Sequence, residues 1–264
     1  MSCGTETPAI PAAVSQIARG RPVRLVWANE IGRTFEVGNG TDRCFVKWSP
    51  LTAGTDLAAE AARMTWAAEY TPVPRVLAIG TNETATWLVT APLPGCNAVE
   101  DKWTARPRTA VRAIGQGLRA MHDALPVESC PFSWMARDRA DWAVRAAAEG
   151  RFDPDAGWEP VDHYPSISEA VEATANIPPV DRLVVCHGDA CAPNTLLTDD
   201  GRWSGHVDLG QLGVADRWAD LAVATWSTEW NYGPGWEDEL LTAYGVAPDP
   251  ERTRYYRLLW DFGP

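Results

Sequence analysis

The chain has 264 residues, of which 23 are Lys or Arg and 35 are Asp or Glu, so its formal net charge is −12 at pH 7. Hydrophobic residues make up 45% of it, which is enough for a sizeable core and too much for a disordered chain. The acidic balance argues against a nucleic-acid partner, because phosphate backbones attract faces rich in Lys and Arg. It favours a cationic small molecule as the partner.

The sequence predicts a cytoplasmic protein with no membrane association. No apolar run reaches the roughly 18 residues that a spanning helix needs. Residues 1–14 contain no basic residue and no continuous apolar stretch, so they do not read as a secretory signal. The six cysteines form no C-x-x-C pair, which is typical of reduced, buried thiols and argues against zinc. Both a monomer and a weak dimer remain open.

The first part of the chain, residues 1–91, is predicted to be a small β-rich lobe. Strands are expected at residues 23–27, 34–37, 44–48, 75–80 and 86–90, with a helix at 57–69. Asn39-Gly40 is a hairpin turn signal between the second and third strands. Two prolines and a glycine then interrupt the pattern, and residues 92–96 are interpreted as a hinge.

The remainder, residues 97–264, is predicted to be a larger and mainly helical lobe. Helices are expected at residues 107–123, 134–150, 166–175, 216–230, 236–244 and 250–260. Short strands are expected at residues 183–186, 195–197 and 203–207. The whole pattern indicates the α+β fold class, with one lobe on each side of the hinge.

The most informative segment follows the short apolar strand that ends at Cys186. Asp189 lies where that strand enters a loop, Asn194 follows five positions later, and Asp208 comes after a further strand. A hairpin between the last two would place an amide oxygen beside a carboxylate, which are the hard ligands that Mg²⁺ prefers. Asp189 is then free to accept the proton of an attacking hydroxyl. This arrangement is typical of kinases, which transfer phosphoryl groups.

A second pair of residues in the small lobe supports the same chemistry. Lys47 lies on an alternating strand, and Glu60 lies on the apolar stripe of the following helix. A carboxylate in that position requires a partner, and the strand lysine is the natural one. Such a pair positions the phosphates of ATP in kinases. A snorkelling lysine with a glutamate at the edge of the helix face is the structural alternative.

These motifs resemble those of the aminoglycoside O-phosphotransferases, and in places those of the streptomycin 3″-phosphotransferases. The resemblance rests on residues 185–189 (Val-Cys-His-Gly-Asp) with Asn194, and on the run from Val207 to Leu221, and it extends over nearly the whole chain. It implies a protein-kinase-like two-lobed fold with ATP in the cleft. It also implies that Asp189 is the catalytic base, that Asn194 and Asp208 bind Mg²⁺, and that Asp220 braces the catalytic loop.

The nucleotide contacts are also expected from the resemblance. The sequence has no G-x-x-x-x-G-K-[ST] loop and no full G-x-G-x-x-G, which is a departure from other phosphate-binding patterns. Phosphate contacts are assigned to Gly32, Arg33 and Thr34, beside Lys47 and Glu60. Backbone hydrogen bonds to adenine are assigned to the segment that contains Thr90, Ala91 and Leu93.

The acceptor is expected to be a cationic aminoglycoside, because an acidic pocket attracts polycations. Asp216 and Arg217 form the Asp-Arg pair that lies near the substrate in related enzymes. Further candidate carboxylates are Asp153, Asp155, Glu159, Glu229 and Asp261. The chain ends in Leu-Trp-Asp-Phe-Gly-Pro, so one of the two acids found at the end of related 3′-kinases is missing.

The predicted function is ATP-dependent phosphorylation of the 3″-hydroxyl of streptomycin, giving antibiotic resistance. It is favoured by residues 128–132 and by the tryptophan-rich residues 226–236, since guanidinium groups stack well on aromatic rings. One alternative is a 3′-kinase of the kanamycin and neomycin type, and another is a kinase of a different cationic metabolite. A non-catalytic binding module is disfavoured, because it has no need of Lys47, Asp189, Asn194 and Asp208 together.

Overall fold

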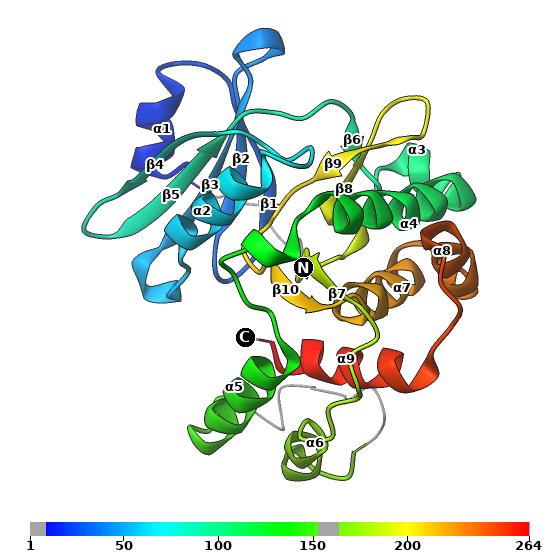
Figure 1. The fold of residues 1–264 in the computed structure, drawn as a ribbon. Coiled ribbons are helices and arrows are strands. Elements are labelled where there is room, and N and C mark those ends of the chain that lie inside the picture. The colour runs from blue at the N-terminus through cyan, green and yellow to red at the C-terminus, as the bar shows by residue number, and fades with distance from the viewer. Residues whose placement is uncertain (1–8, 153–163, 264) are drawn as a thin grey trace, which may run out of the picture. The chain divides into compact units, whose positions relative to one another are not determined.

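The computed structural model of the protein describes residues 9–152 and 164–263. Within them the chain forms two compact units, drawn in Figure 1. The first consists of the described residues up to Thr65 together with Pro74–Pro92. The second consists of Trp66–Val73 and of the chain from Leu93 onward. An antiparallel sheet dominates the first unit and helices dominate the second, so the α+β class is confirmed.

The first unit is built on an antiparallel sheet with the strand order β1-β2-β3-β5-β4. The strands are β1 (Val23–Ala28), β2 (Arg33–Val37), β3 (Cys44–Pro50), β4 (Val76–Thr81) and β5 (Ala85–Thr90). All five strand predictions are therefore confirmed to within two residues at each end. The β2–β3 hairpin is also present, but its connection holds a 3₁₀ turn at Gly40–Asp42. Asn39 has φ −139°, so it does not adopt the positive φ that a two-residue turn of type I′ requires.

Each face of this sheet has a different covering. Phe35, Val37 and Val46 point to one face, where they pack against Val14 and Ala18 of helix α1 (Ala12–Ala18). The sequence pattern did not predict α1, which is only seven residues long. The alternation of strand side chains directs Lys47 to the opposite face, together with its cross-strand neighbour Thr34. Helix α2 (Leu57–Ala67) begins where the sequence predicted it and ends two residues earlier.

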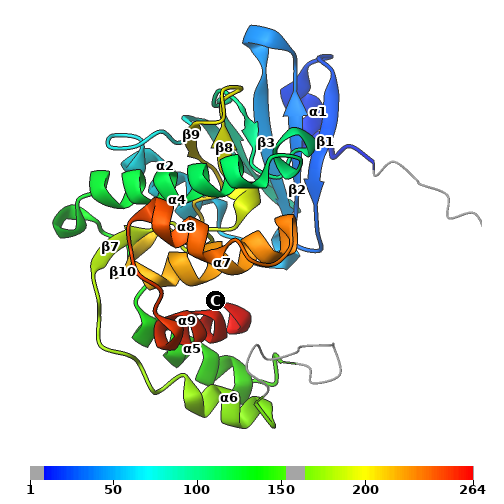
Figure 2. The ribbon, with the colours of Figure 1, turned by 90° about the vertical axis from the view of Figure 1, so that its right-hand side faces the viewer.

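The second unit is a stack of helices with short strands. Its helices are α3 (Asp101–Thr104), α4 (Pro107–Ala124), α5 (Ala136–Ala148), α6 (Ile167–Ala173), α7 (Trp218–Tyr232), α8 (Glu237–Tyr244) and α9 (Pro250–Phe262). Figure 2 shows α4, α8, α7 and α9 following one another through this unit. Helix α4 packs so closely on α8 that a Cβ at Gly115 would lie 2.5 Å from the carbonyl oxygen of Leu240. Glycine is therefore required at this crossing. Among the described residues, no helix is long and apolar enough to cross a membrane.

The short strands of this unit carry the informative segment. β7 (Leu183–Cys186) pairs with β10 (Gly213–Asp216), and β8 (Thr195–Leu197) lies between β6 (Cys96–Asn97) and β9 (Trp203–His206). The sequence pattern predicted β7, β8 and β9 but neither β6 nor β10, and it also missed α3. The expected helix start at Asp216 is wrong, because Asp216 pairs with Leu183 at the end of β10 and α7 begins at Trp218.

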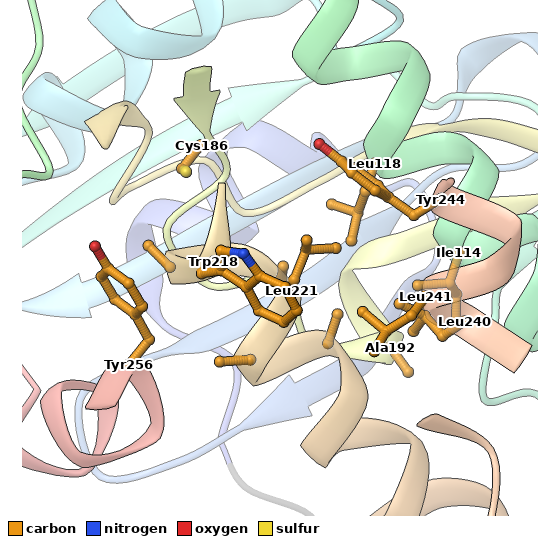
Figure 3. Close-up of a cluster of buried hydrophobic side chains, with 14 of the residues drawn as sticks. Ile114, Leu118, Cys186, Ala192, Trp218, Leu221, Leu240, Leu241, Tyr244 and Tyr256 are labelled. Carbon is orange, nitrogen blue, oxygen red and sulfur yellow. The ribbon is translucent and has the colours of Figure 1, made fainter. Parts of the chain in front are cut away.

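A large apolar core packs many of these elements together (Figure 3). Trp218 and Leu221 of α7 are buried against Tyr244 of α8, Ile114 of α4 and Tyr256 of α9. Full burial of one large apolar side chain is worth about 1.5–3 kcal/mol. The core therefore fixes α7 firmly, and α7 in turn carries the residues that position the loops described next.

Candidate active site

The loop after β7 holds the predicted base in a tight turn. β7 is buried from Val184 onward and ends at Cys186. Gly188 follows with φ +88°, and a Cβ there would lie 2.4 Å from the carbonyl oxygen of Gln211. Only glycine fits this position, because both the backbone conformation and the contact exclude a side chain. The turn brings the next residue, Asp189, to the point where the loop meets Asn194.

Asp189 and Asn194 are directly hydrogen bonded. The Asn194 Nδ2 donates to the Asp189 carbonyl oxygen and to its Oδ2, both at 3.0 Å. The other carboxylate oxygen, Oδ1, is shielded from solvent and accepts no hydrogen bond from a nitrogen or oxygen atom of the described residues, while the Cys191 thiol is close enough to the carboxylate for this contact to raise the pKa of the thiol. A buried acceptor without a donor is uncommon in proteins and calls for an explanation. This oxygen is available to a hydroxyl group that donates to it.

Asn194 and Asp208 are neighbours across the β8–β9 hairpin, as the sequence predicted. β8 and β9 are antiparallel with Thr195 opposite His206, and the Val207 amide donates to the Asn194 carbonyl at 3.0 Å. Asp208 then turns sharply, with φ +64°. A left-handed backbone at a residue other than glycine is uncommon, although Asp adopts it more readily than most residues, and such positions cluster at active sites. Because the amide nitrogen of Asn194 is taken by Asp189, the amide oxygen is the atom left for a metal ion.

Asp220 braces the turn from helix α7, as expected from the resemblance. Its Oδ2 accepts the His187 amide at 2.6 Å and lies 2.9 Å from His122 Nε2, and its Oδ1 accepts the Gly188 amide at 2.9 Å. Burial by itself raises the pKa of Asp220, but the hydrogen bond from His122 and the nearby histidines outweigh it and hold this pKa below its ordinary value. Asp220 therefore stays ionised and fixes two backbone amides of the loop.

His187 has a structural role in this loop. Its Nδ1 accepts the Asp189 amide at 3.2 Å and its Nε2 donates to the Val207 carbonyl at 2.9 Å. Both ring nitrogens are therefore used to tie the Asp189 turn to the Asp208 turn. The two nearby cysteines do not have the character of nucleophiles, because burial raises the pKa of Cys186 and of Cys191.

The first unit contains the predicted Lys47–Glu60 pair. Lys47 Nζ donates to Glu60 Oε2 at 2.8 Å. The Glu60 side chain is almost entirely buried, whereas a quarter of the Lys47 side chain is exposed. The alternative of a snorkelling lysine and a separate glutamate is therefore wrong. A buried carboxylate that fixes one partly exposed ammonium leaves that ammonium able to bind an anion.

The structure locates the other proposed nucleotide contacts and shows which groups they already bind. The Gly32 amide donates to Asn29 Oδ1 at 2.9 Å, and the Arg33 guanidinium donates to the Ala9 carbonyl at 3.3 Å. Thr34 lies opposite Lys47 across the β2–β3 ladder. Of the three, only Thr34 is placed beside the Lys47 ammonium by the sheet register, so Gly32 and Arg33 are less suited to phosphate contact.

The proposed adenine segment lies at the end of β5. Thr90 is buried and pairs with Phe45, and the Ala91 amide donates to the Arg75 carbonyl at 2.9 Å. Leu93 belongs to the second unit. The amide of Ala91 is therefore already used, which leaves its carbonyl oxygen as the group that can accept a hydrogen bond from a base.

Asp216 and Arg217 are braces, and their surroundings do not fit direct contact with a substrate. Asp216 is buried, and its two oxygens accept the amides of Asp181 at 2.7 Å and Trp218 at 3.0 Å. Burial raises its pKa. Arg217 donates to Asp181 Oδ2 at 2.6 Å and is mostly buried. Both residues fix the start of α7, which explains why they follow one another in the sequence.

Of the remaining predicted acids, Glu229 and Asp261 belong to the described part of the chain. Glu229 is exposed near the end of α7, twelve residues after Arg217, and hence about 18 Å further along the helix axis. Asp261 lies on α9, which packs on α7. Glu159, Asp153 and Asp155 lie outside the described residues.

Two residues that support the loop were not predicted from the sequence. His122 on α4 bridges Asp220 and the Tyr244 hydroxyl, which lies 2.9 Å from its Nδ1. Ser227 on α7 accepts the Ala192 amide of the loop at 2.9 Å and a hydrogen bond from Asn231. His122 had a signal that could have been used, because it lies on the apolar face of a strongly amphipathic helix. Ser227 had none.

The α+β protein has an Asp, an Asn and a second Asp on adjoining loops, and its first unit pairs a Lys of the sheet with a Glu of helix α2. These are the parts of a kinase-type phosphotransferase. Comparison with known proteins agrees. The phosphotransferase enzyme family matches residues 22–256 of this chain. The chain therefore belongs to that family and is a kinase of the aminoglycoside phosphotransferase type, with the protein-kinase-like fold.

Three relatives illustrate the similarity. The chain is 39% identical over 224 residues to the aminoglycoside 3′-phosphotransferase of Streptomyces fradiae (81% of this chain, 82% of the relative). It is 34% identical over 231 residues to the streptomycin 3″-kinase of Streptomyces griseus (80% and 82%). It is also similar to the structure of APH(3″)-Id from Streptomyces rimosus in complex with ADP and streptomycin, with 28% identity, a TM-score of 0.72 and coverage of 95% and 97%.

Proposed function

We propose that this protein transfers the γ-phosphoryl group of ATP to a hydroxyl group of an aminoglycoside, giving ADP and a phosphate monoester. The observation that carries the proposal is the shielded Oδ1 of Asp189, which accepts no hydrogen bond from a nitrogen or oxygen atom of the described residues. Such an oxygen is suited to accept the proton of the acceptor's hydroxyl group while the hydroxyl oxygen forms its bond to phosphorus. Asn194 holds the carboxylate in position through the other oxygen.

Mg²⁺ fits the groups at the neighbouring turn. The amide oxygen of Asn194 and the carboxylate of Asp208 are hard oxygen ligands, and the amide of Val207, which precedes Asp208, donates to the Asn194 carbonyl. Bound there, the ion would supply charge neutralisation for the phosphate oxygens. The left-handed backbone of Asp208 is compatible with this assignment, because strained positions cluster at active sites.

For the nucleotide we assign Lys47 to the α- and β-phosphates, with Glu60 as its orienting partner. Thr34 is the neighbour that the sheet register places beside Lys47, and Gly32 and Arg33 are kept as further phosphate candidates. Thr90, Ala91 and Leu93 are proposed for the adenine. Because the reaction consumes ATP, we place the protein in the cytoplasm.

The first acceptor that we propose is the 3″-hydroxyl of streptomycin. It is supported by the 34% identity to a streptomycin 3″-kinase and by the similarity to a structure that contains ADP and streptomycin. The second is the 3′-hydroxyl of the kanamycin and neomycin group, which the 39% identity to an aminoglycoside 3′-phosphotransferase favours. Antibiotic resistance would be the consequence of either activity.

The test is a coupled ADP-release assay with ATP and Mg²⁺ against streptomycin, kanamycin, neomycin, hygromycin, choline and homoserine. Release with streptomycin would support the first acceptor, and NMR of the product would identify the phosphorylated position. Release with kanamycin or neomycin alone would support the second acceptor. No release with any of the aminoglycosides, while ATP still binds, would overturn the proposed function.

A variant separates the metal assignment from the rest of the proposal. Asp208→Asn should lower kcat by about 10²-fold or more, since a ligand carboxylate is lost at the phosphates. Asp238→Asn, which changes an exposed acid on α8, is the matched control and should keep the wild-type rate. Equal rates for the two variants would contradict the assignment of Asp208.

A further inference from the structure

Three tryptophans form a compact aromatic cluster where α7 and α9 meet. Trp226 and Trp230 come from α7 and Trp260 from α9. The ring centroids of Trp226 and Trp230 are 4.6 Å apart, those of Trp226 and Trp260 are 5.8 Å apart, and those of Trp230 and Trp260 are 5.5 Å apart. Every ring therefore contacts the other two. We call these three residues the tryptophan cluster.

The tryptophan cluster is not part of the buried core. Trp230 is 49% exposed, and both other rings are partly exposed. The core of the unit uses other aromatic residues of the same two helices, Trp218 and Tyr256, which are almost fully buried. Large aromatic surface left in contact with water is more typical of a binding site than of a packing site.

The tryptophan cluster already holds one planar cation. The guanidinium carbon of Arg257 lies 5.6 Å from the ring centroid of Trp226. Hydrogen bonds to the Ala222 carbonyl at 3.2 Å and to Glu237 at 2.9 Å fix this guanidinium in place. The chain therefore displays a guanidinium on one of these rings, while the half-exposed ring of Trp230 has room for another.

Negative charge accompanies the exposed ring. Trp226, Glu229 and Trp230 have the i, i+3, i+4 spacing of one helix face, and Glu229 is exposed. Arg257, Trp260 and Asp261 have the same spacing on α9. The last turn of α7 also has the negative end of the helix dipole. An aromatic face bordered by carboxylates favours a cation over a neutral or anionic ligand.

The tryptophan cluster is adjacent to the helix turn that holds the catalytic loop. Ser227, whose hydroxyl accepts the Ala192 amide of that loop, directly follows Trp226. Asn231, which directly follows Trp230, donates to Ser227. A molecule bound on the rings would therefore lie on the segment of α7 that contacts the loop between Asp189 and Asn194.

We propose that Trp226, Trp230 and Trp260 form a subsite for a guanidinium group of the acceptor, with Trp230 as the stacking face and Glu229 as the neutralising acid. The inference rests on the proposed function and names its substrate class, namely an aminoglycoside that carries guanidinium groups. A planar guanidinium stacks on an aromatic face, whereas an ammonium is a compact and strongly hydrated charge. The subsite thus distinguishes the two kinds of aminoglycoside.

The test is a direct binding measurement by calorimetry on the full chain without nucleotide. Streptomycin, which carries guanidinium groups, and kanamycin, which carries only amines, are titrated into the wild-type protein, Trp230→Ala and Trp230→Phe. Trp230→Ala should weaken streptomycin binding by about five- to thirty-fold, while Trp230→Phe should lose less than about threefold because it keeps an aromatic face. Kanamycin binding should change by less than about twofold.

Tyr70→Ala is the matched control. Tyr70 is 39% exposed and its ring lies 5.2 Å from that of Trp66, so this variant also removes a half-exposed aromatic side chain from an aromatic pair. It should leave streptomycin binding unchanged. In steady-state kinetics with streptomycin, Trp230→Ala should raise KM by the same factor as Kd and change kcat by less than about twofold, which a general packing defect would not do.

Several outcomes would overturn the inference. They are unchanged streptomycin binding in Trp230→Ala, equal losses for streptomycin and kanamycin, and a wild-type protein that binds kanamycin but not streptomycin. In the last case, phosphorylation of kanamycin would leave the proposed function intact. Conversely, streptomycin binding that depends on Trp230, with no ADP release on any aminoglycoside, would support the subsite and refute the phosphotransfer proposal.

Discussion

Replacing Asp220 by asparagine tests how the catalytic loop is held. The wild-type carboxylate accepts the amides of His187 and Gly188 and lies 2.9 Å from His122 Nε2, all without exposure to solvent. An asparagine keeps one acceptor oxygen and replaces the other by a donor. If its oxygen serves His187 and His122, its NH₂ group faces the Gly188 amide, so two donors meet.

The expected loss follows from these contacts. One hydrogen bond to a charged acceptor is lost, which is worth about 1.5–3 kcal/mol, and the remaining bonds are made to a neutral group. We therefore expect the free energy of unfolding to fall by about 2–4 kcal/mol, which is a large share of the roughly 5–15 kcal/mol of a typical domain. Urea unfolding at pH 7.5 measures it. The kcat should also fall by at least about tenfold, because the loop that contains Asp189 loosens.

Asp123→Asn is the control for this prediction. Asp123 pairs with Arg119 at 2.5 Å and with Arg182 at 3.0 Å, but its side chain is 41% exposed. Asp123→Asn should lower the free energy of unfolding by less than about 1 kcal/mol, as is usual when surface ion pairs are removed. An unfolding free energy of Asp220→Asn within about 0.5 kcal/mol of the wild type would refute the reasoning, because the buried amides would then be satisfied without the carboxylate.

Three further predictions follow from the same structure. Lys47→Met should raise the KM for ATP by about tenfold or more, because the ammonium held by Glu60 is removed, whereas Lys102→Met should not change it. Gly188→Ala should destabilise the protein by more than about 2 kcal/mol, since its Cβ would lie 2.4 Å from a carbonyl oxygen. Burial, with His187 nearby, lowers the pKa of His206 to about 3. The unfolded state therefore binds a proton between about pH 6.5 and 3 that the native state does not, and stability should fall by about 2 kcal/mol from pH 7.5 to 5.

Each of these has a result that would contradict it. An unchanged KM for ATP in Lys47→Met would remove the nucleotide role of the Lys–Glu pair. Gly20→Ala is the control for Gly188→Ala, because Gly20 has φ +82° and no heavy atom within 4 Å of its Cβ position, so this variant reports the backbone strain alone. If both variants lowered the free energy of unfolding equally, the close contact at Gly188 would be contradicted. A stability profile below pH 6.5 that is as steep in His206→Gln as in the wild type would exclude His206 as its cause.

Much of the fold could be predicted because the signals were local. Strands β2 and β3 of the first unit alternate between buried and less buried side chains, and α4 has a regular apolar face. Helix α1 was missed because a seven-residue helix obtains its stability from packing, here of Val14 and Ala18 on the sheet. β10 was missed because it exists only through pairing with β7, which lies about thirty residues earlier in the chain.

In the site, too, features that are local in the sequence could be predicted and contacts between distant residues could not. The Asn194–Asp208 hairpin depends on a short spacing along the chain, so the sequence predicted it, whereas the hydrogen bond between Asp189 and Asn194 was seen only in the structure. The support of the loop by His122 depends on a contact across 98 residues of sequence, which no local pattern reveals. The two backbone amides that donate to Asp216 could not be predicted either, because a motif gives the residue type at a position and not its contacts.

The most direct test of the central claim is to detect the phosphorylated drug by mass spectrometry. Wild-type protein, Asp189→Asn and the surface control Asp238→Asn are each incubated with ATP, Mg²⁺ and either streptomycin or kanamycin. The account predicts a monophosphate product with the wild type and the control, and a rate lower by about 10²–10⁴-fold in Asp189→Asn, with ATP binding retained. A product formed by Asp189→Asn at the wild-type rate, or none formed by the wild type, would contradict it.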